Sequence, residues 1–181
     1  VSILRRESSD DHGLIKSVAT YLLYLTNDLE GCRLLIQQGN LNRNASLHKE
    51  AGRCYEKALE DLGRFHDEEA DRLFVEAVLQ YLKVYTDDPV SDQIRSFIRE
   101  ATDRALARGF RSSLALLELN MARSEWLQSS YQTATKHFNR GWALAEASGD
   151  SETQKAAMVF KQHFNYFLGH YQEVIRIYER L

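Results

Sequence analysis

The residues best suited to chemistry are the run His66-Asp67-Glu68-Glu69 and two cysteines, Cys32 and Cys54. Imidazole and carboxylate groups bind divalent metals, but this run falls where a helix is expected to begin, and acids there cap the helix and complement its dipole. The cysteines form no CxxC pair, so we expect two buried thiols. No GxGxxG, GxxxxGK or HExxH motif occurs in the sequence. The sequence therefore predicts no enzyme activity, no metal site and no cofactor.

The charge balance gives little reason to expect nucleic-acid or membrane binding. The net charge of -3 is small. The arginines between positions 95 and 111 are interleaved with acids, which is typical of a solvated, salt-bridged helix face. No apolar run reaches the ~18 residues that span a bilayer, and residues 1–11 lack the apolar region of a signal peptide. We expect a cytoplasmic protein and a segment of a longer chain.

Helices have to position any functional side chain, because apolar residues recur at three- and four-residue spacing along most of the chain. A single proline among 181 residues also favours long helices. We expect Gly39 and Gly63 to end helices, Asp88-Pro89 to begin one, and Ser151 with Gln154 to form a capping box. The expected helices number about nine, at approximately 14–25, 28–38, 42–62, 67–85, 89–108, 112–128, 131–147, 151–166 and 171–181.

One pattern of three residues recurs along the chain. A small or apolar residue is followed four positions later by an aromatic or apolar one, and three positions further on by a third residue. Successive copies stand 43, 40 and 40 residues apart, and Gly109 and Gly149 keep the same interval of 40. A single helical hairpin cannot bury its apolar face alone, so such units stack. The matching triplets are Ala51-Tyr55-Ala58, Ile94-Ile98-Ala101, Ala134-Phe138-Gly141 and Val174-Tyr178-Leu181.

These triplets resemble the second-helix pattern of the tetratricopeptide repeat family. The 40-residue interval and the phrase from Ala143 to Asp150 are similar to the longer repeats of bacterial signal-transduction ATPases and MalT-like regulators. In the first helices, Glu118 stands where that family has a large aromatic residue. The resemblance implies an all-α fold, a right-handed superhelix of antiparallel helix pairs. Residues 1–40 fit neither repeat register, and we expect them to form an atypical or capping helical pair. Residues 41–181 are expected to form one continuous domain with repeats at approximately 41–66, 67–109, 110–149 and 150–181.

The resemblance also implies that the first helix of each pair lines a concave groove that contacts ligands. Aromatic and arginine side chains dominate binding hot spots, and asparagine can bond an extended peptide backbone. An alternative for Trp126 and Tyr166 is packing at the end of a hairpin. Lys83 is matched with Arg123 one 40-residue repeat earlier. The predicted binding residues are Lys83, Asn120, Arg123, Trp126, His163 and Tyr166.

The expected function is protein–protein interaction, by a scaffold or sensor segment of a larger bacterial regulatory protein. The partner would be a peptide, a helix or a neighbouring domain bound in the groove. An alternative is a domain that senses a small-molecule effector, as in MalT-like transcription regulators, and several polar groups in one pocket would favour it. A further alternative is a homodimer through exposed terminal helices, because a last repeat without a capping helix leaves an apolar face that a second copy can cover.

Overall fold

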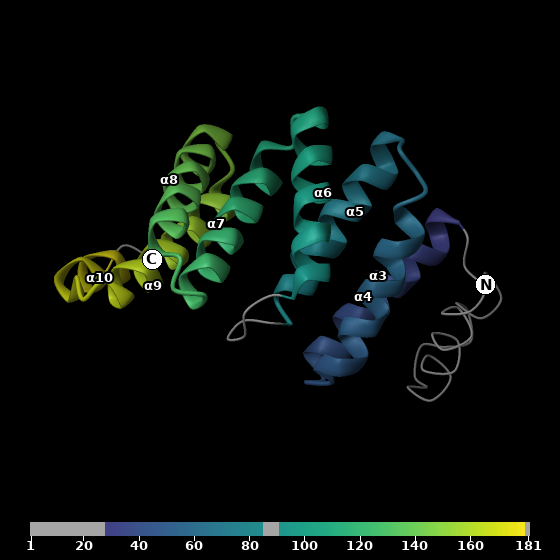
Figure 1. Ribbon diagram of the computed structural model, residues 1–181, viewed down its shortest axis with the longest axis horizontal. Helices are drawn as coiled ribbons and strands as arrows, with labels where there is room; N and C mark the ends of the chain where they lie inside the picture. Colours follow the sequence, from purple (N-terminus) through teal and green to yellow (C-terminus); the bar gives the residue numbers. More distant parts are fainter. Residues whose placement is uncertain (1–27, 85–90, 180–181) are drawn as a thin grey trace. The chain divides into compact units, whose positions relative to one another are not determined.

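The structure is a computed structural model that describes residues 28–84 and 91–179. All regular structure in these two ranges is helical, which confirms the all-α fold class (Figure 1). The chain forms two compact units that divide between Val84 and Tyr85. The first unit contains α3 (Leu29–Asn44), α4 (His48–Leu62) and α5 (Glu68–Leu82). The second contains α6 (Asp92–Arg108), α7 (Arg111–Leu127), α8 (Tyr131–Ser148), α9 (Ser151–Phe167) and α10 (Tyr171–Tyr178).

Three pairs of helices form hairpins with the same turn. The pairs α3–α4, α7–α8 and α9–α10 are each joined by three residues, and the central residue has a left-handed backbone. The φ angles are 60° at Ser46, 60° at Ser129 and 76° at Gly169. In each turn the following amide donates to the carbonyl five residues earlier, which closes the helix end. The turns at Ser129 and Gly169 keep the predicted 40-residue interval, so these hairpins are repeats of one unit.

Successive hairpins meet through a pair of aromatic rings. In the first unit the ring of Tyr55 on α4 lies 6.0 Å from that of Tyr81 on α5. In the second unit Phe138 on α8 stacks on Phe164 on α9, with centroids 4.6 Å apart and planes inclined by 5°. At both places the aromatic residue of the repeat pattern packs between its own hairpin and the helix that follows. Tyr178 holds the same position on α10 and is 74% exposed.

Small residues let the helices approach closely enough for this contact. Gly141 on α8 is buried, and a Cβ atom added to it would lie 2.8 Å from Leu119 Cγ and 3.1 Å from the Ala115 carbonyl oxygen on α7. Gly39 plays the same part in the first unit, where an added Cβ would lie 2.6 Å from Tyr55 Cε1. The prediction that Gly39 ends a helix is therefore wrong. Helix α3 continues to Asn44 because this glycine makes room for a ring.

The helix starts confirm one predicted cap and correct two. Asp67 caps α5, accepting from the Ala70 amide at 3.0 Å, as the acid run predicts. Helix α6 is capped by Ser91, whereas Asp88 and Pro89 lie outside the described residues. Helix α9 is capped by Asp150, which accepts from the Thr153 amide at 3.2 Å, so the capping box predicted from Ser151 does not form the cap. The aspartate one residue earlier reaches the free amides.

One expected helix lies outside the described residues, and one expected repeat boundary does not coincide with a helix end. The helix expected at 14–25 lies outside the described residues. The boundary expected between residues 40 and 41 falls inside α3, whereas residues 110–149 and 150–181 correspond to the α7–α8 and α9–α10 hairpins. The superhelical course stays a prediction. Within the described ranges no helix is both long and apolar enough to cross a bilayer.

The close approach at Gly141 predicts the effect of one methyl group. Gly141→Ala should lower the free energy of unfolding by about 1–2 kcal/mol, because overpacking costs ~1–3 kcal/mol and the better helix propensity of alanine returns up to ~1 kcal/mol. Gly63→Ala is the control, since an added Cβ there meets only backbone oxygens at 3.4 Å or more. It should leave stability unchanged or raise it by up to ~1 kcal/mol. Urea unfolding measures both, and equal effects would contradict the packing at Gly141.

Buried thiols predict a loss of stability at alkaline pH. Burial raises the pKa of Cys32 and of Cys54 to about 11 and that of Tyr55 to about 12. The ordinary thiol pKa is 9.0, so above pH 9 the unfolded chain loses these protons first and unfolding becomes easier. Between pH 9 and 11 the unfolding free energy should fall by about 1–3 kcal/mol. Urea unfolding across this range tests it, and a Cys32→Ala, Cys54→Ala double variant should show a smaller fall.

Candidate functional site

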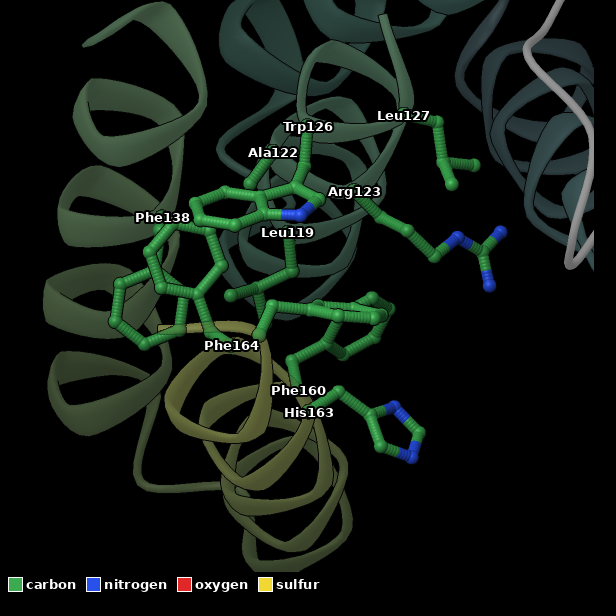
Figure 2. A pocket seen from close by; sticks show the side chains of 10 residues that line it. Leu119, Ala122, Arg123, Trp126, Leu127, Phe138, Phe160, His163 and Phe164 are labelled. Carbon is green, nitrogen blue, oxygen red and sulfur yellow. The ribbon is translucent and has the colours of Figure 1, made fainter. Parts of the chain in front are cut away.

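A pocket of about 260 Å³ lies among α7, α8 and α9 of the second unit. Five aromatic side chains make up much of its wall, and Leu119, Ala122 and Leu127 add aliphatic surface. Arginine and histidine are the two polar residue types in the lining (Figure 2). The pocket therefore offers an apolar interior with few orienting groups. The aromatic residues are Trp126, Phe138, Phe160, Phe164 and Phe167.

The aromatic wall is built by the contact that joins the two hairpins. Phe164 stacks on Phe138 and meets the indole of Trp126 edge-on, with centroids 4.9 Å apart and planes inclined by 65°. Trp126 also packs edge-on against Tyr131 at 4.7 Å and stacks on Phe167 at 5.8 Å. These rings hold one another in place at distances usual for aromatic pairs. Trp126 consequently serves both as hairpin packing and as pocket wall.

The polar groups stand together on one side of this wall. Arg123 and His163 both extend away from Phe138, on the side where Leu127 lies (Figure 2). The Arg123 guanidinium donates to Asn120 Oδ1 at 3.2 Å and lies 6.0 Å from the centre of the Phe160 ring. His163 is exposed to solvent. A ligand that enters the pocket would therefore meet a cation at its edge.

The predicted binding residues divide into three groups. Arg123, Trp126 and His163 line the pocket. Asn120 is next to it, donating to the Leu116 carbonyl at 2.8 Å and accepting from Arg123, so it positions the arginine. Tyr166 does not line the pocket; it is 58% exposed, and its ring contacts the ring of Phe167, which does line it, and the ring of Tyr171.

Sequence reasoning did not include the phenylalanines among the predicted binding residues. Phe138 was identified as a repeat position, and its ring partner Phe164 sits 40 residues after Ser124, which hides the aromatic from a search for self-similarity. The signal that could have found the pocket is the density of aromatics. Residues 160–171 contain five aromatic residues among twelve, and four of them meet another ring.

The aromatic contacts also fix how the two units correspond. Eighty-three residues separate Tyr55 from Phe138, and the same interval separates Tyr81 from Phe164. Ile98 on α6 precedes Phe138 by only 40 residues. Three extra residues therefore lie between α5 and α6, so the repeat interval is 43 residues where it crosses this connection and 40 residues elsewhere.

This register moves Lys83 within the repeat. It places Lys83 at the position of Trp126, 43 residues earlier, and not at the position of Arg123 that a uniform 40-residue interval gives. Lys83 is the C-cap residue of α5. Loss of hydration at its ammonium group and, to a smaller extent, the charge of the nearby Arg43 lower its pKa. Lys83 belongs to the first unit and the pocket to the second, so its part in binding stays a prediction.

The equivalent positions in the first unit carry polar residues. Arg43 and Gln80 stand 83 residues before Trp126 and His163. Arg43 Nη1 donates to Gln80 Oε1 at 2.7 Å, so these two side chains join directly across α3 and α5. The aromatic pocket therefore comes from particular residues of the second unit and is not a consequence of helical pairing alone.

Charged residues inside the second unit support its hairpins. Glu118, which departs from the first-helix pattern, is 4% exposed and pairs with His137 Nδ1 at 2.7 Å and Arg140 Nη1 at 3.1 Å on α8. The basic run expected to be a solvated face is partly buried, because Arg104 is 7% exposed and is held by Glu100 at 2.6 Å. The Glu118 pairs join α7 to α8, whereas the Arg104–Glu100 pair lies within α6.

Ligands for a metal ion do not converge in the described part of the chain. No group of three or more histidine, cysteine, aspartate or glutamate residues there is arranged to hold an ion. The pocket itself contains no carboxylate and no thiol. Its chemistry is limited to apolar contact, ring stacking and one permanent cation.

Comparison with known proteins adds no relationship to this description. No protein family matches the chain, and no curated protein matches it.

The Glu118 cluster predicts a difference between buried and exposed ion pairs. Glu118→Gln should lower the free energy of unfolding by about 1–2 kcal/mol, because a bond to a charged partner is worth ~1.5–3 kcal/mol and the partly exposed Arg140 side chain regains some hydration. Glu173→Gln is the matched control: its pair with Arg176 spans 2.6 Å, but both side chains are exposed. Such a pair contributes ~0–1 kcal/mol. Urea unfolding compares the two, and a larger loss from Glu173→Gln would contradict the assignment.

Proposed function

We propose that the second unit is a protein-binding module whose aromatic pocket receives one apolar side chain of a partner. The observation that carries this is the pocket itself, about 260 Å³ in volume and walled by five aromatic residues. Aromatic pockets of this kind hold the anchor residues that dominate protein interfaces. Trp126, which lies both in the wall and in the hairpin contact, is held ready by its neighbours, and this reduces the ordering cost of binding.

The pocket favours a side chain over a small-molecule effector. Small-molecule sites are usually ~300–1,000 Å³ and carry several polar groups that fix the ligand's orientation. This pocket is smaller, and only Arg123 and His163 among its lining residues are polar. A single side chain needs no further orientation, because the rest of the partner supplies it by contacting the surrounding helices.

The wider setting is part of the same proposal. The resemblance to tetratricopeptide and MalT-like repeats supports a role as a segment of a larger regulatory protein. Two free, buried thiols, Cys32 and Cys54, suit a reducing compartment such as the cytoplasm. Repeated hairpins of this kind offer extended surfaces for partners.

Selection from a random peptide library tests the proposed function. Peptides recovered on the full chain should bind Trp126→Ala and Phe160→Ala at least about 30-fold more weakly, because an interface anchor contributes ~2 kcal/mol or more. Fluorescence anisotropy of labelled peptides measures the affinities, and circular dichroism checks that each variant is folded. Phe160 is half-buried, so its variant provides a second test if Trp126→Ala unfolds.

Tyr178→Ala is the matched control for loss of an aromatic side chain. Tyr178 is 74% exposed on α10 and does not line the pocket. Peptide affinity should be unchanged in this variant. Recovery of peptides whose affinity falls in Tyr178→Ala but not in the two pocket variants would rule out the pocket as the binding site.

A further inference from the structure

Two of the sequence segments that build the pocket contain basic residues and no acidic ones. Residues 126–145, which include most of α8, contain no aspartate or glutamate, and neither do residues 153–172, which include most of α9. The same segments contain three lysines, one arginine and three histidines. The whole chain carries a net charge of -3, so this part departs from the average.

The nearest acids of α7 are held by other residues. Glu118 is buried against His137 and Arg140, and this pairing offsets the charge of Arg140. Glu125 is also buried, and it accepts from Arg95 Nη1 of α6 at 2.8 Å. Neither carboxylate therefore presents a free negative charge to a ligand in the pocket.

The one acidic residue of α9, Glu152, lies at the end of the helix far from the pocket. Glu152 precedes Phe160 by eight residues, which is about 12 Å along a helix axis. It bonds to Lys155, in an exposed pair. At the pocket end of the helix lies His163, on the same side of the pocket as Arg123 (Figure 2). The pocket thus combines an apolar interior with a positive edge.

We propose that the partner segment combines a large aromatic or aliphatic side chain with an aspartate or glutamate close to it in sequence. The apolar side chain enters among Trp126, Phe138 and Phe160, and the carboxylate pairs with the Arg123 guanidinium. Arginine suits this role because its planar group binds both oxygens of a carboxylate. Lys161, whose ammonium lies 4.3 Å from the centre of the Trp142 ring, adds to the positive charge of α9. This inference rests on the proposed function and specifies its partner.

Peptides recovered from the random library provide the probe. Those whose binding depends on Trp126 should be enriched in acids beside an aromatic or large aliphatic residue. A fluorescein-labelled peptide of this group should bind at least about tenfold more weakly when its acids are replaced by glutamine. Raising the salt concentration should also weaken binding, because the pair at the pocket edge is accessible to ions. These changes are made in the peptide or the solvent, so they leave the folding of the protein intact.

A charge reversal on the protein tests the same pair from the other side. Arg123→Glu should weaken the acidic peptide at least about tenfold and should strengthen a version of it in which lysine replaces the acids. Arg53→Glu makes the same change at an exposed position of α4 in the first unit and should leave both affinities unchanged.

Three results would overturn the inference, and they separate it from the proposed function. Pocket-dependent peptides that show no acid enrichment and no loss in Arg123→Glu would leave protein binding in place and remove the acidic partner. Peptides whose affinity is unaffected by Trp126→Ala and Phe160→Ala would remove both. Light scattering that shows a dimer of the wild-type chain and a monomer of Trp126→Ala would make a second copy the occupant.

Discussion

The contact between aromatic rings of successive hairpins is the interaction on which the rest of the structure depends. A helix pair buries only part of its apolar surface, and the ring that projects from its second helix has to find cover on the next pair. The ring of Phe138 packs on that of Phe164, and the ring of Tyr55 packs against that of Tyr81. The contact is possible only because a residue without a side chain, Gly141 in the second unit, lets α8 lie directly on α7.

The pocket follows from this contact and from what surrounds it. Where the neighbouring positions hold Arg43 and Gln80, the side chains bond to each other across the helices. Where they hold Trp126 and His163, the indole packs on the stacked rings and leaves an apolar space with the Arg123 guanidinium at its edge. One arrangement of helices therefore gives a closed polar contact in one unit and a receptive apolar surface in the other.

Buried charges take the place of apolar packing at several helix contacts of the second unit. Glu118 lies where the repeat pattern calls for an aromatic residue, and it draws His137 and Arg140 of α8 toward α7. Glu125 draws Arg95 of α6 in the same way. Each buried carboxylate needs its partners, so it accepts one alignment of the helices and disfavours others. These pairs also keep the acids of α7 away from the pocket, which leaves its edge positive.

The sequence by itself determined the helices, most of their limits and the 40-residue interval, because these depend on local spacing, on caps and on left-handed turn residues. It also led, through the resemblance to tetratricopeptide repeats, to Arg123, Trp126 and His163 as predicted binding residues, and these three line one pocket. Tertiary structure alone decided whether Gly39 ends a helix or admits a ring, because that depends on Tyr55, which approaches from another helix. It alone decided that Glu118 is buried and that five aromatic side chains enclose a pocket. Burial and enclosure depend on contacts between side chains far apart in sequence, and local residue spacing gives no information on which of these side chains come into contact.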